Sequence, residues 1–158
     1  MKSEHQIRVE EFMRRAEQEL PSGPSMPSQY IRTLRARLIL EEALETVQAL
    51  GVAVHLESSY GLVGVYIAGL RYFSAGDHDL VEAVDGCCDL RVVTTGTLSA
   101  LGVQDESVQK IVDDANLRKF GPGSYKDVDG KWIKPPDFVP PQEALVLELQ
   151  QQAQTARV

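Results

Sequence analysis

Residues 38–50 spell LILEEALETVQAL, an apolar stretch that carries three glutamates. Glu42 and Glu45 are three positions apart and Glu41 and Glu45 are four apart, so a helix presents all three on nearly the same face. On an ordinary surface helix the apolar residues lie opposite the charged ones. Here they flank the acidic set on both sides. The stretch therefore predicts a helix whose glutamates are candidate functional residues.

Residues 81–93, VEAVDGCCDLRVV, repeat the pattern. Asp85 and Asp89 are one helical turn apart, and Glu82 lies one turn before Asp85. Two such clusters on facing helices repel each other unless a cation neutralises them, and carboxylate oxygens suit Mg²⁺ or Mn²⁺. Gly86 adds to this hypothesis, since a glycine inside a helix costs about 1 kcal/mol and usually has a packing or ligand reason. The alternative is that these acids lie on solvated faces.

Apolar periodicity and end signals predict five helices. They are expected at residues 5–20, from the cap Ser28 to Gly51, from Asp77 or Asp79 to Gly102, from the cap Asp105 to about Lys119, and over residues 141–155 with Pro141 in the first turn. Residues 51–77 fit either a small β-hairpin or a short helix. Residues 120–141 contain too much Gly and Pro for regular structure. The expected fold class is all-α, a four- to five-helix bundle forming one domain over residues 1–158, with a core at 5–138.

The composition is that of a globular protein rather than a membrane or secreted one. The chain has 158 residues, a mass of 17.5 kDa, 43% hydrophobic residues and 25% charged residues. Its two cysteines, Cys87 and Cys88, are adjacent and give neither a disulfide framework nor a CxxC metal site. The first twenty residues have no apolar core of a signal peptide, and no stretch is long enough to cross a membrane. We expect a cytoplasmic protein without a membrane partner.

The charge is unevenly distributed along the chain. The net charge is -7, yet residues 118–134 contain five basic and two acidic residues. An acidic body argues against a nucleic-acid partner, whose binding protein would carry a broad basic surface. Acidic helices with one basic segment suit a metal-bound polyphosphate, although a solvated acidic surface with a basic loop is the simpler alternative.

Three segments together resemble a known superfamily. They are LEEALE (40–45), DGCCDLRVVTTGTLSALG (85–102) and DDANLRKFGPGSYKDVDGKWIKPPDF (113–138). With the first helix they cover roughly residues 5–138, and they resemble the all-α nucleoside triphosphate pyrophosphatases. This MazG-like superfamily includes phosphoribosyl-ATP pyrophosphohydrolase and the dimeric dUTPases, and the last segment resembles the phage-type branch that includes MazZ. One departure is that the usual ExxD pattern would place its first acid at Gly86, so Asp85 has to take that role.

The resemblance implies hydrolysis of a (d)NTP to a (d)NMP and diphosphate with two or three Mg²⁺ or Mn²⁺ ions. It implies a set of metal ligands, of which the three glutamates are also the catalytic set: Glu41, Glu42, Glu45, Asp85 and Asp89. Either Glu41 or Glu82 would accept the proton of the attacking water. The metals would neutralise the charge that develops at the α-phosphorus.

The resemblance also implies a substrate-binding set in the basic segment. Asn116 and Lys119 would reach the phosphates from one helix face, and Lys131 and Lys134 would close over the diphosphate. The base would be recognised elsewhere, around Phe12 on the first helix and by residues 51–77. A purine nucleotide such as dGTP or GTP is the candidate substrate, with dUTP, dCTP and phosphoribosyl-ATP as alternatives. Relatives assemble as dimers or tetramers, so a homodimer or homotetramer is expected, in the host cytoplasm if a phage encodes the chain.

Other function classes fit the sequence less well. His78 and Asp79 form the HD dipeptide of another phosphohydrolase family, but His5 and His55 lack the spacing of its further metal ligands. A di-iron bundle requires an ExxH motif, which the chain does not contain. A non-catalytic helical adaptor remains the alternative of another class, and it would show no stabilisation by Mg²⁺ or Mn²⁺.

Overall fold

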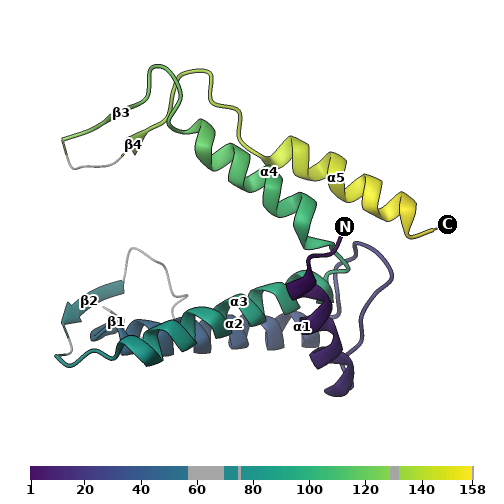
Figure 1. Ribbon diagram of the computed structural model, residues 1–158, viewed down its shortest axis with the longest axis horizontal. Helices are drawn as coiled ribbons and strands as arrows, with labels where there is room; N and C mark the ends of the chain where they lie inside the picture. Colours follow the sequence, from purple (N-terminus) through teal and green to yellow (C-terminus); the bar gives the residue numbers. More distant parts are fainter. Residues whose placement is uncertain (57–69, 75, 129–131, 158) are drawn as a thin grey trace. The chain divides into compact units, whose positions relative to one another are not determined.

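The structure is a computed structural model that describes residues 1–56, 70–74, 76–128 and 132–157 (Figure 1). In these ranges the chain forms five helices and two small antiparallel strand pairs, which confirms the all-α fold class. It divides into two compact units, one of Ser28–Thr94 and one of Met1–Pro27 with Thr95–Val158. The single domain expected over residues 1–158 stays a prediction.

The unit of residues 28–94 is built on two antiparallel helices. Helix α2 spans Gln29–Ala49 and is capped by Ser28, whose hydroxyl accepts a hydrogen bond from the Ile31 amide at 3.3 Å. Helix α3 spans Leu80–Ala100, and its residues up to Thr94 belong to this unit. The Asp79 amide donates to the Ala49 carbonyl at 2.8 Å, so the start of α3 lies beside the end of α2 (Figure 1).

The beginning of α3 is fixed by a side-chain cap. The Asp79 carboxylate accepts hydrogen bonds from the amides of Val81 at 2.8 Å and Glu82 at 3.2 Å. These are two of the amides that a helix leaves unpaired at its N-terminus. Of the two expected starts, Asp79 is therefore the correct one.

A β-hairpin connects α2 to α3. Strand β1, Val52–Leu56, pairs antiparallel with β2, Leu70–Ser74, in a register that joins Val52 to Ser74 and Leu56 to Leu70. Gly51 precedes the hairpin with φ of +74°, a conformation that glycine adopts without strain. The hairpin alternative is confirmed for these strands, and residues 57–69 lie outside the described residues.

In the other unit, the first helix is shorter than expected. Helix α1 spans Glu4–Arg15, and Ser3 caps it by accepting from the Gln6 amide at 3.0 Å. The predicted end at residue 20 is wrong because Glu17 turns left-handed, with φ of +56°, directly after the helix. The Gln18 amide then donates to the Met13 carbonyl at 2.9 Å, which closes the last turn.

Two further helices pack as an antiparallel pair in this unit. Helix α4 spans Asp105–Arg118 and α5 spans Gln142–Thr155 (Figure 1). The buried amide of Gln152 accepts from the Gln104 backbone amide at 2.8 Å and donates to the Gln104 carbonyl at 3.2 Å. The end of α5 is thereby held at the start of α4.

Two details of this unit correct the sequence expectations. Asp105 is the first residue of α4 and not its cap, because its carboxylate instead accepts a hydrogen bond from the Ser3 amide at 2.8 Å. Residues 120–141 do contain regular structure, although little: β3, Tyr125–Lys126, pairs antiparallel with β4, Trp132–Ile133. Phe120 contributes an edge-to-face contact with the Trp132 ring at 5.3 Å between centroids, which supports the strand pair.

A buried amide joins α1 to the residues that precede α4. The Gln6 side chain is fully buried and donates to the Ser99 hydroxyl at 3.1 Å and the Val103 carbonyl at 2.7 Å, while its own oxygen accepts from the Asp105 amide at 2.9 Å. Val9 and Met13 fill the buried face of α1 beside it. Across the described ranges, we find no helix with the length and apolar character to span a membrane.

Candidate active site

The three glutamates of α2 differ in their surroundings. Glu42 is half-buried, whereas Glu41 and Glu45 are exposed. The Oε1 atom of Glu41 lies 3.3 Å from Nε of Arg37, one helical turn earlier. Sequence reasoning did not single out Arg37, although its spacing of four residues from Glu41 was visible.

Glu42 is influenced by the charges of carboxylates on both α2 and α3. Its pKa is raised above the usual range by burial first and then by the charges of Asp89, Glu45, Glu41 and Asp85. A raised carboxyl pKa means that the charged form is disfavoured in this environment. The structure therefore brings the five predicted metal ligands into one negative field, with Glu42 at its least solvated point.

A close approach of the two helices explains the unusual position of the acids on α3. A Cβ atom added to Gly86 would lie 2.5 Å from the Thr46 hydroxyl oxygen and 3.1 Å from the Thr46 Cα and Cβ atoms. A side chain therefore does not fit at residue 86, where the common ExxD pattern would have its first acid. Asp85, one position earlier, is exposed, and its carboxylate can take the place of the first acid of that pattern.

The donor chemistry at this site fits a divalent cation. Every candidate ligand offers carboxylate oxygens, which Mg²⁺ and Mn²⁺ prefer, and a cation would stabilise the charged form of Glu42, which burial first and the neighbouring carboxylates second disfavour. Among the residues that the structure describes, no three His, Cys, Asp or Glu side chains are arranged closely enough to hold an ion. The carboxylates of α2 and α3 therefore raise the pKa of Glu42 without forming such a group. Glu82, the other candidate base, is exposed in the first turn of α3.

The predicted phosphate-binding residues belong to the other unit. Asn116 and Lys119 meet at the end of α4, where the Lys119 ammonium donates to the Asn116 side-chain oxygen at 2.7 Å. The Lys134 ammonium lies 4.8 Å from the centroid of the Phe138 ring. Lys131 lies outside the described residues.

A pocket lies next to these basic residues. It has a volume of about 420 Å³, and Arg118, Asp137 and Phe138 are among the residues that line it. The Phe138 ring, which contacts the Lys134 ammonium, also lines this pocket. The sequence gives no reason to single out Arg118, because a basic residue in the last turn of a helix is common for electrostatic reasons alone.

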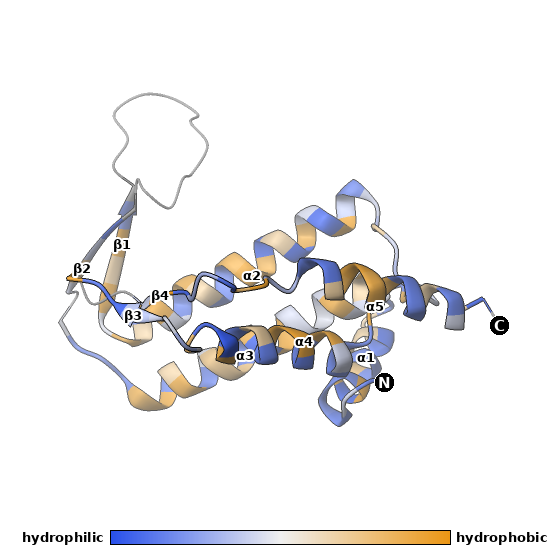
Figure 2. Cartoon of the chain, turned by 90° about the horizontal axis from the view of Figure 1, so that it is seen from above, coloured by the Kyte–Doolittle hydropathy of each residue, from blue (hydrophilic) through white to orange (hydrophobic). Residues whose placement is uncertain are grey.

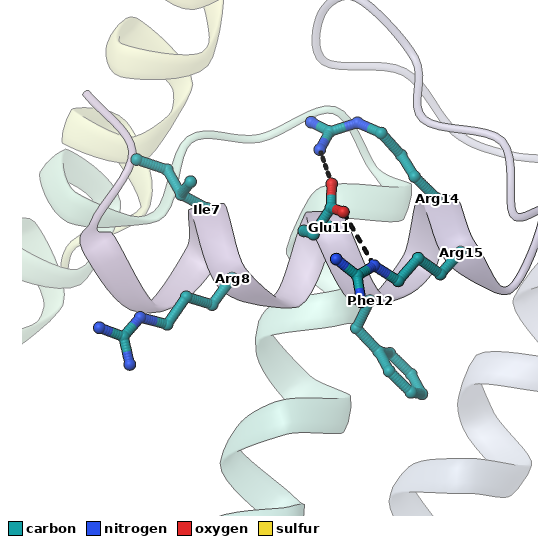
Figure 3. A pocket seen from close by; sticks show the side chains of 6 residues that line it. All are labelled: Ile7, Arg8, Glu11, Phe12, Arg14 and Arg15. Atoms are coloured by element: carbon teal, nitrogen blue, oxygen red, sulfur yellow. Dashed lines mark hydrogen bonds and ion pairs between the residues drawn. The ribbon is translucent and has the colours of Figure 1, made fainter.

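Helix α1 lines a second pocket of about 550 Å³, and Phe12, around which base recognition is expected, is one of its lining residues (Figure 3). The Phe12 side chain is exposed rather than packed in the core, and Arg8, Arg14 and Arg15 lie around the pocket. Glu11 is occupied by two of them, at 2.9 Å from Arg15 and 3.4 Å from Arg14, and the Arg15 hydrogen bond lowers its pKa. Figure 3 shows these two contacts and the Phe12 ring free of both.

A comparison with protein families identifies the core of the chain. The model of the family described as phosphoribosyl-ATP pyrophosphohydrolase matches residues 9–116, which is more than half of the sequence. The match includes all five candidate metal ligands and ends at Asn116, so Lys119 and Lys134 lie beyond it. The chain has no match among the curated proteins.

Proposed function

Because the chain belongs to the phosphoribosyl-ATP pyrophosphohydrolase family of the MazG-like superfamily, we propose that it hydrolyses nucleoside triphosphates in a reaction that requires divalent metal ions. The family indicates a pyrophosphohydrolase in general. The reaction proposed for this chain is (d)NTP + H₂O → (d)NMP + diphosphate. The observation that supports it most is the shared negative field of Glu42 and its four acidic neighbours on two facing helices.

The carboxylates of α2 and α3 are proposed to hold two or three Mg²⁺ or Mn²⁺ ions and to manage the proton of the attacking water. Bound ions supply a water of lowered pKa and neutralise charge on the phosphates. Glu42, Glu45, Asp85 and Asp89 would be committed to the metals. Glu41, on the exposed side of the set, is the proposed proton acceptor, and its carboxylate lies 3.3 Å from Nε of Arg37.

The basic residues at the end of α4 are proposed to bind the triphosphate. Lys119 and Asn116 already contact each other at 2.7 Å, which holds both side chains on one face of the helix. Lys134, together with Lys131, would close over the leaving diphosphate and neutralise its charge. A lysine suits this role because its ammonium is a mobile point charge.

The base is proposed to bind beside α1. An exposed Phe12 ring offers a stacking surface, and arginine side chains donate hydrogen bonds to the O6 and N7 atoms of guanine. This combination favours dGTP or GTP among the candidate substrates. Phosphoribosyl-ATP is the second candidate, because the matching family model bears its name; dUTP and dCTP lack the N7 and O6 pair.

We also propose a homodimer or homotetramer that acts in the cytoplasm on the nucleotide pool, with neither nucleic acid nor membrane as partner. Large apolar side chains of the helices α2 and α3 are exposed in the chain alone, among them Leu40 and Leu80. Figure 2 shows hydrophobic residues distributed along both helices. Such a surface is typical of an interface between subunits.

The test is product analysis with a panel of nucleotides. The purified chain is incubated with Mg²⁺ or Mn²⁺ and each of the common NTPs and dNTPs, and with phosphoribosyl-ATP, and the products are separated by chromatography. We expect monophosphate and diphosphate from a guanine nucleotide, at least a hundredfold less from Glu42→Gln and Asp89→Asn, and an unchanged rate from the exposed control Glu143→Gln.

Two outcomes contradict the proposal in different ways. Orthophosphate with a nucleoside diphosphate would mean that another bond is cut. No turnover of any substrate, together with no rise in melting temperature on addition of metal, would favour the helical adaptor.

A further inference from the structure

Gly86 lies at a point where α3 closely approaches α2. The position is enclosed by Thr46, whose hydroxyl oxygen, Cα and Cβ would lie 2.5, 3.1 and 3.1 Å from an added Cβ. Separations under 3.0 Å do not occur between a real Cβ and its neighbours, so one helix would have to move. Thr46 itself is buried.

The glycine is required for space and not for backbone conformation. The glycines with positive φ in the described part of the chain are Gly51, Gly76, Gly102 and Gly123, and Gly86 is not one of them. It lies within the regular helix α3, where alanine is the better helix former. The absence of a side chain at residue 86 therefore serves the contact with α2.

Rotation of the Thr46 side chain would cost a hydrogen bond. Its hydroxyl donates to the Glu42 carbonyl at 2.7 Å, the bond that a helical threonine makes to the preceding turn. Even without the hydroxyl oxygen, the Thr46 Cα and Cβ would remain at 3.1 Å, a separation that a shift of a few tenths of an ångström relieves. The hydroxyl oxygen of Thr46 therefore causes the severe clash with an added Cβ, whereas its Cα and Cβ cause only a mild one.

The contact lies in the middle of the acidic cluster. Thr46 follows Glu45 directly and is one turn after Glu42, and Gly86 follows Asp85 directly and precedes Asp89 by three positions. Any change in the helix separation at this contact is therefore passed to the distance between the two sets of carboxylates.

We infer that Gly86 is a positioning residue, which sets the spacing of the carboxylates on α2 and α3 by allowing direct contact with Thr46. The inference rests on the proposed function, since the carboxylates are taken as the metal ligands. It also makes Gly86 and Thr46 a coupled pair, so that a defect caused by one is relieved by a change at the other.

The experiment is a double-mutant cycle of Gly86→Ala and Thr46→Ala in the full chain. We measure Mn²⁺ affinity by titration calorimetry, melting temperature without metal, and kcat and KM for the preferred nucleotide. The exposed Cys88→Ala on the same helix is the control. Gly86→Ala is expected to bind Mn²⁺ at least tenfold more weakly, to lower kcat at least tenfold with KM changed less than threefold, and to melt at a lower temperature although alanine is the better helix former.

The second substitution separates a spacing defect from a simple loss of stability. Thr46→Ala removes the hydroxyl oxygen, so the double variant is expected to bind Mn²⁺ within threefold of Thr46→Ala alone. If Gly86→Ala does not fold, this comparison carries the test, because the two proteins differ only at residue 86. Equal Mn²⁺ binding by wild type and Gly86→Ala, or a double variant as defective as Gly86→Ala, overturns the inference. Absence of Mn²⁺ binding and turnover in the wild type instead overturns the proposed function.

Discussion

At the scale of single residues, Glu42 is the carboxylate whose surroundings differ most from water. Burial and the charges of its acidic neighbours raise its pKa, so the folded chain binds a proton at Glu42 more tightly than the unfolded chain does. By linkage, the charged form of Glu42 opposes folding. The stability present below the unfolded value of 4.5 is lost as the pH rises through the folded pKa.

Neutralising Glu42 is therefore expected to stabilise the metal-free chain. Glu42→Gln should raise the melting temperature at pH 7 in the presence of a chelator, because the substitution removes a charge that the folded state disfavours. The gain should disappear at pH 4, where Glu42 is largely protonated in the wild type. Thermal unfolding followed by circular dichroism at both pH values measures this, with Glu143→Gln as the exposed control.

The opposite sign would be informative. If Glu42→Gln lowered the melting temperature at pH 7 without metal, the Glu42 carboxylate would be held by favourable contacts, and the repulsion among the five acids would not describe the site. The sequence alone predicts which acids share a helix face, because that depends only on their spacing. It did not predict that Glu42 is the least solvated of them, which depends on packing between helices.

At the scale of elements, helix positions followed from apolar periodicity, and their ends followed less well. The end of α1 at Arg15 depends on the left-handed backbone of Glu17, a conformation for which a glutamate gives no sequence signal. Asp105 looked like a cap, yet its carboxylate accepts from Ser3, about one hundred residues away in sequence. Such long-range partners are decided by tertiary packing and are not visible in a local pattern.

The buried amides show the same limit. Gln6 and Gln152 are buried, although glutamine is normally exposed, because each pairs with backbone groups at the start of α4. A periodicity argument assigns both residues to a polar face. Their role becomes visible only when the unpaired amides at the N-terminus of α4 are counted.

Gln6 is therefore expected to be a main attachment of α1. Gln6→Leu keeps a side chain of similar size but leaves the Ser99 hydroxyl, the Val103 carbonyl and the Asp105 amide without their partner. An unsatisfied buried polar group costs about 1–3 kcal/mol, so we expect a loss of about 2–4 kcal/mol in the free energy of unfolding. Urea denaturation measures it, and the exposed Gln154→Leu on α5 should change it by less than about 0.5 kcal/mol. A loss below about 1 kcal/mol for Gln6→Leu would show that solvent or a rearranged loop replaces the amide.

At the scale of the whole molecule, the sequence predicts two sets of site residues, and they fall in different units of the chain. The acidic set lies in the unit of residues 28–94, and Asn116, Lys119 and Lys134 lie in the other. Residue types and spacing predict each set separately, since each depends on one or two helices. Tertiary and subunit contacts leave no periodic pattern in one chain, so the sequence does not predict whether one substrate contacts both sets.

The exposed apolar side chains are where the contacts of the proposed oligomer would form. Leu80, Val81 and Val84 share a face in the first turns of α3, with 77, 73 and 56% of their surfaces exposed, and Leu40 and Leu44 share a face of α2. Figure 2 shows the hydrophobic start of α3 in orange. Burial of apolar surface is worth about 25 cal/mol per Å², so two such faces supply a substantial driving force for self-association.

Light scattering coupled to size exclusion is expected to give a mass of two or four times the 17.5 kDa of the chain. Leu80→Asp and Val84→Asp should each shift the protein toward the monomer, because a buried unpaired carboxylate at an interface costs several kcal/mol. Gln151→Asp, which adds the same charge to an exposed position of α5, should leave the mass unchanged. A wild-type monomer at micromolar concentration would contradict the interface, and the exposed leucines and valines of α2 and α3 would then have to face another protein. Loss of nucleotide turnover in the monomeric variants, with melting temperature retained, would further place residues of both subunits in one site.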